Sequence, residues 1–438
     1  MTPRRTDSIA RWLLGIAAAA IPFETYVYLD VGFTLKIPQV CALALLVIGT
    51  QSQRHKARHL EFALVLTAFL TASALSLLPL AWSPGTGESV WGGRQTGLMS
   101  FYNLAFLVLI AFTTALNAKD FRAWRALTLG LLLGASLAVF VEFYRYYLFI
   151  QGKIPASDLW WLPSGIPRLT PRGMAANQFA ATLLAAGGFG IFFLAAFRDR
   201  LSRAERLLFS GCIPVVLIGL LATFSRGPTL GFVLACALGI AYFALWQPRA
   251  VFRILSVTTL VLGLLLLAGE LAPLPFDPAE AVARRIGSAL QLSRSRDASW
   301  AERLGFWENS LEAFASSPIL GRGLSTNLTP HNVPLQVLSE AGVVGFATFA
   351  LLSCFVVMSA ILAIWKTDGG ERHFLAGSLF VLAGYSLYLL VDIGLFQIQT
   401  WMYAGFIVGL AIHAPHVALA ADAPSLSPAF EGGGTDGH

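Results

Sequence analysis

The most informative stretch of the sequence runs from Thr329 to Leu335. Asn332 is a good helix N-cap, and Pro334 suits a first helical turn, where its missing N–H costs nothing. His331 then lies at the positive end of a helix dipole. That field disfavours the imidazolium and keeps the ring neutral, as a general base must be. The alternative is an interfacial histidine that only anchors the helix.

A second short motif runs from Ser225 to Pro228 and separates two apolar segments. Ser225 can cap the following helix, with Pro228 in its first turn. Arg226 is then held at the positive end of that helix, an unfavourable position unless an anion lies between the two. Because an arginine fork holds phosphate oxygens bidentately, Arg226 is a candidate phosphate ligand. A snorkelling interfacial arginine is the alternative.

The segment before His331 predicts an amphipathic helix that carries a second arginine. Ser299 and Glu302 form a capping box at its start. Arg303 falls in the first turn, where it either faces the same site or decorates a solvated face. One apolar stripe follows at helical spacing and consists of Leu304, Trp307, Leu311 and Phe314. The sequence Ser316-Ser317-Pro318 then ends the helix.

Further charged residues are candidates for the same site. Glu340 is followed by Gly342 and Gly345, which allow close helix contact. Glu340 lies about 12 Å into its helix, where a carboxylate is either functional or pairs with an arginine as structural glue. The remaining arginine candidates are Arg94, Arg172 and Arg322.

Other common catalytic signatures are missing from the sequence. There is no phosphate loop of the GxxxxGK type, no GxSxG elbow, no acidic pair of the DxD kind and no His/Asp/Glu cluster at metal spacing. We therefore expect neither a metal nor a cofactor. Four cysteines lie in apolar runs without disulfide or metal spacing: Cys41, Cys212, Cys236 and Cys354.

The elements that must position these residues are membrane helices. The chain has 438 residues, of which 56% are hydrophobic and only 12% charged, and its mean hydropathy is +0.68. Apolar runs of about 20 residues, enough to cross a bilayer, recur from Arg11 to His413. The class is an all-α polytopic membrane protein, which excludes a cytosolic enzyme, a disordered chain, a collagen and a disulfide scaffold. An outer-membrane barrel is excluded because its strands alternate in short segments.

The apolar runs predict about twelve transmembrane helices. They lie at residues 12–29, 36–50, 60–82, 98–117, 126–149, 176–197, 207–224, 228–246, 254–272, 333–364, 374–391 and 400–413. Residues 1–272 would form nine of them. Residues 273–332 would form one long periplasmic loop with short amphipathic helices, 333–413 the last three spans, and 414–438 a disordered cytoplasmic tail.

Charge predicts the orientation of the chain. With both termini in the cytoplasm, about 17 of the 30 basic residues fall in short cytoplasmic loops, as the positive-inside rule requires. This accounts for much of the net charge of +6 without nucleic acid. The other basic residues gather on the exported side, in 150–175 and 273–332. They indicate an anionic ligand there, unless long loops simply escape the rule.

Together these residues resemble the O-antigen ligase and polymerase family, integral membrane glycosyltransferases with about a dozen spans and a late periplasmic loop. Four pieces match in order: Ser225-Arg226-Gly227 with Leu230, Glu302-Arg303 with Trp307, Pro318-Ile319-Leu320-Gly321 with Gly323, and His331-Asn332 with Gly342 and Gly345. They cover about residues 170–350, and the topology is similar over the whole chain.

The resemblance implies transfer of a glycan from undecaprenyl diphosphate to a hydroxyl acceptor at the periplasmic face of the bacterial inner membrane, without metal or nucleotide sugar. In the ligases the acceptor is a sugar of lipid A-core. The family's histidine falls on His331, as base or orienter of the acceptor hydroxyl. Its arginines fall on Arg226 and Arg303, which would bind the diphosphate and stabilise its developing charge. Supporting positions would be Asn332, Glu340, Arg172, Arg94 and Arg322.

The family's branches share these motifs. The expected activity is that of the ligase, because the long loop is single, late and moderate in size. An O-antigen or exopolysaccharide polymerase is the alternative, and a protein O-oligosaccharyltransferase is disfavoured because its C-terminal periplasmic domain is missing. Two other classes remain open. A secondary transporter would need interrupted helices and charges near the midplane of the bilayer, and a non-catalytic scaffold would need no single histidine.

Overall fold

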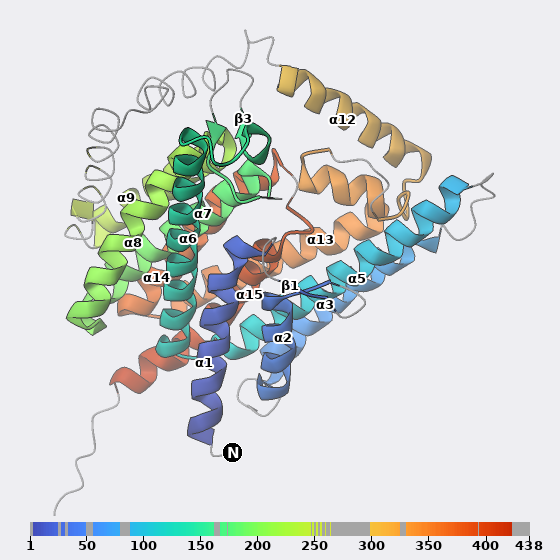
Figure 1. Cartoon of the computed structure of the whole chain (residues 1–438). Coiled ribbons are helices and arrows are strands. Elements are labelled where there is room, and N and C mark those ends of the chain that lie inside the picture. The colour runs from blue at the N-terminus through green and yellow to red at the C-terminus, as the bar shows by residue number, and fades with distance from the viewer. Residues whose placement is uncertain are drawn as a thin grey trace, which may run out of the picture.

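The computed structural model describes residues 3–24, 28–30, 34–49, 56–78, 88–161, 167–172, 174–246, 298–324, 330–392 and 394–422, with isolated positions between 248 and 263. These residues form a bundle of helices (Figure 1). The helices are α1 (Pro3–Ala20), α2 (Ile37–Gly49), α3 (Lys56–Leu75), α5 (Glu88–Asn117), α6 (Phe121–Ile150), α7 (Ala176–Phe197), α8 (Arg203–Ala222), α9 (Arg226–Trp246), α12 (Ala298–Ser316), α13 (Val333–Lys366), α14 (Gly369–Leu389) and α15 (Ile398–Asp422).

Short elements complete the described chain. Two small antiparallel hairpins pair β1 (Tyr28–Asp30) with β2 (Thr34–Lys36) and β3 (Trp160–Trp161) with β4 (Pro167–Arg168). Single 3₁₀ turns lie at Ile21–Phe23, Ala156–Asp158 and Arg198–Arg200.

Seven of the described helices are long and apolar enough to cross a membrane, which confirms the helical membrane class. They are Arg58–Leu75, Gly97–Asn117, Phe121–Ile150, Ala176–Arg200, Arg203–Ala222, Arg226–Trp246 and Val333–Lys366. Helices also occupy the predicted spans at 36–50, 374–391 and 400–413, and the count of twelve stays a prediction. The predicted span at 12–29 was wrong in its second half, because α1 ends at Ala20 and is followed by a 3₁₀ turn and by β1. The predicted span at 254–272 falls almost wholly outside the described residues, as does the loop from 273 to 297. Helix α15 continues to Asp422, past the predicted start of the tail at 414.

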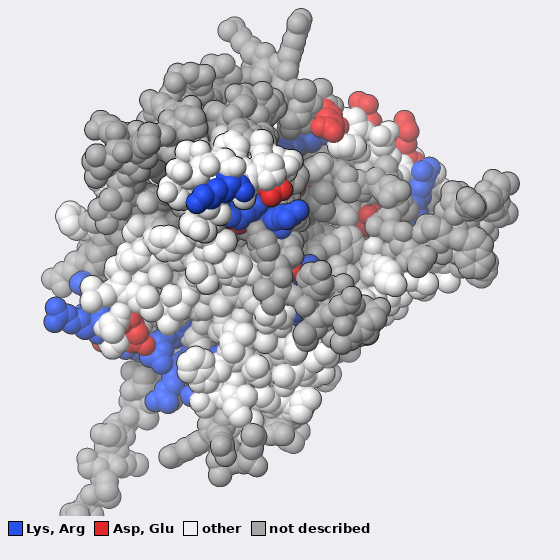
Figure 2. Space-filling view, viewed as in Figure 1, with Lys and Arg blue, Asp and Glu red and all other residues white. Residues whose placement is uncertain are grey.

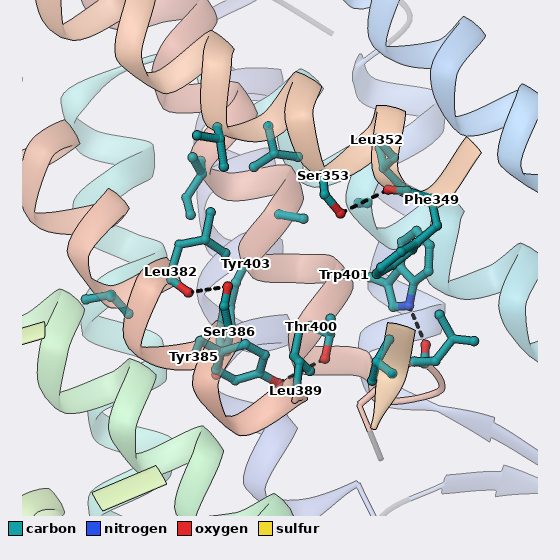
Figure 3. Close-up of a pocket in the computed structure, with 18 of the residues that line it drawn as sticks. Phe349, Leu352, Ser353, Leu382, Tyr385, Ser386, Leu389, Thr400, Trp401 and Tyr403 are labelled. Atoms are coloured by element: carbon teal, nitrogen blue, oxygen red, sulfur yellow. Dashed lines mark hydrogen bonds between the residues drawn. The ribbon is translucent and has the colours of Figure 1, made fainter. Parts of the chain in front are cut away.

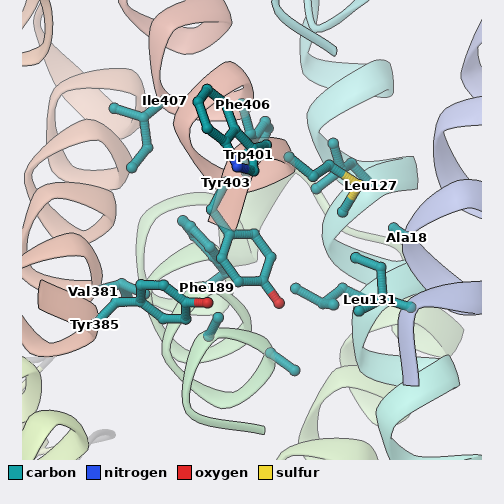
Figure 4. Packing of buried hydrophobic residues seen from close by; sticks show 14 of the residues in the cluster. Ala18, Leu127, Leu131, Phe189, Val381, Tyr385, Trp401, Tyr403, Phe406 and Ile407 are labelled. Carbon is teal, nitrogen blue, oxygen red and sulfur yellow. The ribbon is translucent and has the colours of Figure 1, made fainter. Parts of the chain in front are cut away.

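The centre of the bundle is α7, because nearly all of its surface is covered by other helices. Phe189 of α7 packs against Tyr403 and Phe406 of α15, with ring centroids 5.6 and 5.4 Å apart. Figure 4 shows side chains of α1, α6, α7, α14 and α15 meeting in this core. Small residues let the backbones approach where helices cross. A Cβ atom at Gly231 of α9 would lie 2.2 Å from the carbonyl oxygen of Gly384 of α14.

This crossing joins the first part of α9 to the last part of α14, so the two helices run in opposite directions. The bundle therefore has a His331 end, where α9 and α13 begin and α14 stops, and an Arg200 end, where α8 and α14 begin. At the Arg200 end, Arg200 pairs with the buried carboxylate of Glu371, and Arg125 pairs with Glu205. Figure 2 shows Lys and Arg side chains gathered there, at the lower left.

Candidate active site

His331 lies directly before α13, at the helix N-terminus that the sequence predicts. Asn332 is the N-cap, and its side-chain oxygen accepts a hydrogen bond from the Leu335 N–H at 2.9 Å. The side-chain NH2 group of Asn332 donates a hydrogen bond to the Leu390 carbonyl oxygen at 3.0 Å, and this bond connects the start of α13 to the end of α14. His331 itself has a left-handed backbone, with φ of 49°. The predicted cap is confirmed, and it holds the imidazole at the end of the bundle.

The imidazole of His331 has a carboxylate partner. Its Nδ1 lies 3.3 Å from Oδ1 of Asp392, which belongs to the turn between α14 and α15. The side chain of Asp392 is 9% exposed and that of His331 is 30% exposed, so the ring reaches the surface while its partner stays covered. A carboxylate that accepts from Nδ1–H fixes the ring and leaves Nε2 to accept a proton. This is the geometry that a histidine base requires.

Arg226 is brought to the same region by the contact between α9 and the end of α14. It is the first residue of α9 and is half-buried. A Cβ atom at the next residue, Gly227, would lie 2.9 Å from Cγ2 of Val391, the neighbour of Asp392. The segments that carry Arg226 and Asp392 are therefore packed against each other through the Val391 side chain.

Ser225 lies directly before α9, at the cap position that the sequence predicts, and its carbonyl oxygen accepts a hydrogen bond from the Thr229 N–H at 3.3 Å. Its hydroxyl accepts a hydrogen bond from Nη2 of Arg168 at 2.7 Å. Phe224, just before it, has a left-handed backbone with φ of 51°, so the chain turns sharply between α8 and α9.

Helix α12 covers the start of α13. The indole N–H of Trp307 donates to the carbonyl oxygen of Pro330 at 2.7 Å, and the ring of Phe306 lies 5.8 Å from the His331 ring. Arg303 is half-buried one turn earlier on this helix. The position of α12 therefore places Arg303 on the element that lies against His331.

The predicted end of α12 at Ser316 is confirmed, but its apolar stripe was only partly right. Leu304 and Leu311 are 42% and 52% exposed, whereas Ser310 and Ala313 are fully covered. The helix is rotated from the predicted orientation because Phe306 and Trp307 contact the Pro330–His331 segment. Leu304 and Leu311 therefore stay exposed instead of facing the bundle.

The motif Pro318–Gly323 forms a strap across a break in α13. Gly342 has φ of 64° and interrupts the helix after Ala341. The strap supplies hydrogen bonds there: the Val343 N–H donates to the Pro318 carbonyl oxygen at 2.8 Å, and the Gly323 N–H donates to the Glu340 carbonyl oxygen at 2.9 Å.

Only glycine fits where strap and helix cross. A Cβ atom at Gly342 would lie 2.3 Å from the Ile319 carbonyl oxygen, and one at Gly321 would lie 2.3 Å from the backbone of Glu340. Gly321 also has a positive φ, of 72°. The strap therefore fixes the short first segment of α13, which carries His331 at its start.

The supporting candidates are more scattered. Glu340 is buried in α13, roughly two and a half turns from His331, and accepts a hydrogen bond from Gln336 at 3.3 Å. Arg322 is exposed on the strap and donates to the Ser316 hydroxyl at 2.7 Å. Arg172 is exposed. Arg94 lies in α5, and its side chain is outside the described residues.

An apolar pocket begins beside the His331 end and runs inward between α13, α14 and α15. Val333, Leu389 and Leu395 line it near the site, and Val356 and Ile407 line it deeper in the bundle. Two serine hydroxyls in its wall are turned to their own helices, since Ser353 donates to Phe349 and Ser386 to Leu382 (Figure 3). The hydroxyls of Tyr385 and Thr400 hydrogen-bond to each other, at 2.9 Å. The surface left to a ligand is therefore almost entirely hydrocarbon.

Residues 211–350 match the family model described as O-antigen ligase. The match covers about a third of the chain, and this segment is similar to the O-antigen ligase family. The O-antigen ligase segment begins in α8 and ends in α13, so it contains Arg226, α12, the strap and His331. No curated protein matches the chain.

Two site residues lie outside the O-antigen ligase segment, and sequence reasoning did not assign them. Asp392 lies 61 residues after His331. The one feature of the sequence that could have indicated it is its acidic side chain in the short break between two apolar runs. Arg168 was noted only as part of the positive charge around 150–175. Within the described residues, no group of three or more His, Cys, Asp or Glu side chains is placed to hold a metal ion.

Proposed function

We propose that the chain is an O-antigen ligase, which transfers polysaccharide from undecaprenyl diphosphate to a sugar hydroxyl of lipid A-core. The observation that carries this proposal is the His331–Asp392 pair, held beside the Arg226 turn within a chain whose segment 211–350 matches the O-antigen ligase family model. A base, its orienting carboxylate and a cation at a helix N-terminus suit attack by a hydroxyl on a carbon that bears a diphosphate.

In the proposed reaction, Nε2 of His331 takes the proton of the acceptor hydroxyl as its oxygen attacks the anomeric carbon of the donor. Asp392 holds the ring in the required tautomer and stabilises the imidazolium that forms. The bond between the anomeric carbon and the diphosphate oxygen breaks, and its electrons leave with undecaprenyl diphosphate. Arg226 and Arg303 stabilise that charge with the α9 N-terminus. Asn332 caps the helix that follows His331 and so holds the base in place.

The apolar pocket supports a lipid carrier. It begins at residues next to the His331–Asp392 pair and continues into the bundle between α13 and α14. An isoprenoid chain has no hydrogen-bonding groups, so a wall of leucine, valine and aromatic side chains is suited to it. The carrier's diphosphate would then lie at the His331 end.

We place the protein in the bacterial inner membrane, with the His331 end facing the periplasm and both termini in the cytoplasm. The basic side chains of Lys119, Arg125 and Arg200 support this orientation, since they lie with the Arg200 end of the bundle.

The test is the lipopolysaccharide pattern of a deletion strain that carries wild type, His331→Asn or Arg226→Ala. We expect both variants to insert normally yet lose the whole polysaccharide ladder, with core intact and carrier-linked polymer accumulating. A surviving single-repeat band would instead identify a polymerase of the same family. A normal ladder in both variants would refute the proposed site.

A secondary transporter is the second candidate, and one observation favours it. Helix α13 is interrupted at Gly342 beside the buried Glu340, as the helices of many transporters are. However, the strap hydrogen-bonds the backbone groups on both sides of the break, so these groups do not turn toward a cavity. Substrate-dependent uptake into proteoliposomes that contain the purified chain would identify it as a transporter.

A further inference from the structure

Arg168, on β4, hydrogen-bonds to two other segments, the nearby start of α7 and the turn between α8 and α9, which lies more than 50 residues further along the chain. Its Nε donates to the Thr223 carbonyl oxygen at 2.8 Å, at the end of α8. Its Nη2 donates to Oδ1 of Asn177 at 2.9 Å, in the first turn of α7, and to the Ser225 hydroxyl at 2.7 Å. The next residue, Leu169, donates its backbone N–H to the Ala222 carbonyl oxygen at 3.1 Å. Strand β4 is thereby attached to the turn between α8 and α9.

That turn has a conformation that side chains rarely adopt. Phe224 is buried and has a left-handed backbone, which is unfavourable for a bulky residue unless the surroundings impose it. Within the turn, the Ser225 N–H donates to the Thr223 hydroxyl at 3.2 Å. The guanidinium of Arg168 holds the residues on both sides of Phe224, so it fixes the turn at the point of greatest strain.

Arg226 follows this turn directly. The direction in which the Arg226 side chain points depends on the backbone of residues 223–225, since α9 starts immediately after these residues. A group that fixes these residues therefore fixes the direction of the Cα–Cβ bond from which the Arg226 guanidinium extends. Arg168 can do so because its planar fork uses Nε and Nη2 together, and the single ammonium of lysine cannot span the same acceptors.

We propose that Arg168 is a positioning residue, which holds the Thr223–Ser225 turn so that Arg226 points at the donor diphosphate. This inference rests on the proposed function. It assigns Arg168 to the donor side of the site and gives it no contact with the acceptor.

The test compares Arg168→Lys, which keeps the charge but loses the fork, with Arg226→Lys and the double variant in the purified full chain. Two quantities are measured: binding of undecaprenyl diphosphate, and the KM values for carrier-linked donor and for lipid A-core. For Arg168→Lys we expect the donor KM and the dissociation constant to rise about tenfold, with the acceptor KM unchanged. The double variant should bind no more weakly than Arg226→Lys, because both changes remove one interaction.

Two further variants separate positioning from general damage. Ser225→Ala removes one of the three hydrogen bonds and should give a smaller rise in the same donor KM. Arg122→Gln changes an exposed cation in the first turn of α6, at the Arg200 end, and should change neither KM. Thermal midpoints in detergent identify any variant that fails to fold.

The possible results separate the role of Arg168 from the role of Arg226. Losses that multiply in the double variant, or equal rises in donor and acceptor KM, would overturn positioning through Arg226. Wild-type donor KM in Arg168→Lys, with Arg226→Lys impaired, would overturn the inference alone. Wild-type binding in Arg226→Lys would refute the diphosphate role of Arg226 and with it the inference.

Discussion

At the scale of the residue, the site depends on one contact that joins two distant turns of the chain. His331 extends from the start of α13, and Asp392 meets its Nδ1 from the turn after α14. Asp392 is nearly buried and His331 is not. The carboxylate therefore acts on the ring and not on a ligand directly.

The role of Asp392 predicts the effect of Asp392→Asn. The amide keeps the size of the side chain but removes the charge that stabilises an imidazolium, so we expect the transfer rate to fall about 10- to 100-fold with little change in donor KM. Single-turnover rates on carrier-linked donor measure this. Asp368→Asn is the control, since Asp368 is an exposed N-cap at the Arg200 end. An unchanged rate in Asp392→Asn would mean that His331 works without a partner.

Asn332 predicts a stability effect at the same place. Asn332→Ala removes the cap of α13 and the tether to Leu390, so unfolding should become easier by about 1–2 kcal/mol. The thermal midpoint in detergent, followed by tryptophan fluorescence, checks this. Asn309→Ala is the matched control because Asn309 is exposed on α12. Equal midpoints for the two variants would show that the cap contributes nothing.

At the scale of the element, the strap and the broken helix α13 form one unit. The strap's carbonyl and N–H groups replace those that the helix lost at Gly342. The strap also follows α12 directly, so Trp307 and the strap hold the first segment of α13 from two sides. Histidine, cap and covering helix are thereby fixed relative to one another.

The crossing of strap and helix predicts that Gly342→Ala is severe. An alanine there needs a positive φ, which costs about 1–2 kcal/mol, and its Cβ would overlap the Ile319 carbonyl group. We expect loss of transfer together with a lower thermal midpoint. Gly305→Ala, in α12, has open space around its Cβ position and should be neutral or stabilise by about 0.5–1 kcal/mol. Transfer at the wild-type rate by Gly342→Ala would contradict the proposed role of the strap.

At the scale of the whole molecule, local signals predicted more than long-range ones. The cap at Asn332, the start of α9 at Arg226 and the end of α12 at Ser316 follow from neighbouring residues, and the sequence predicted all three. The break at Gly342 was interpreted as close helix contact, because a glycine in an apolar run permits either. Asp392 and Arg168 were not assigned, because their partners lie 61 and 57 residues away and only the packed bundle brings them together.

The polarity of the bundle gives a prediction for the intact cell. In a chain without its native cysteines, Lys153→Cys should react with a membrane-impermeant maleimide in whole spheroplasts, and Arg203→Cys only after lysis. Both positions are exposed; Arg203 lies at the Arg200 end, and Lys153 follows α6, whose first turn lies at that end. Reversed labelling would place the His331 end in the cytoplasm and rule out a periplasmic acceptor.

The left-handed backbone at His331 limits which residues can replace it. Most side chains avoid a φ near 49°, whereas asparagine, aspartate and glycine tolerate it. An alanine scan would therefore confound two effects here, since His331→Ala removes the imidazole and also strains the peptide. His331→Asn keeps the turn and isolates the chemistry. By the same reasoning, few substitutions at position 331 leave the fold intact. If a copy of this protein lost its activity but kept its fold, asparagine is the residue that could most easily replace His331.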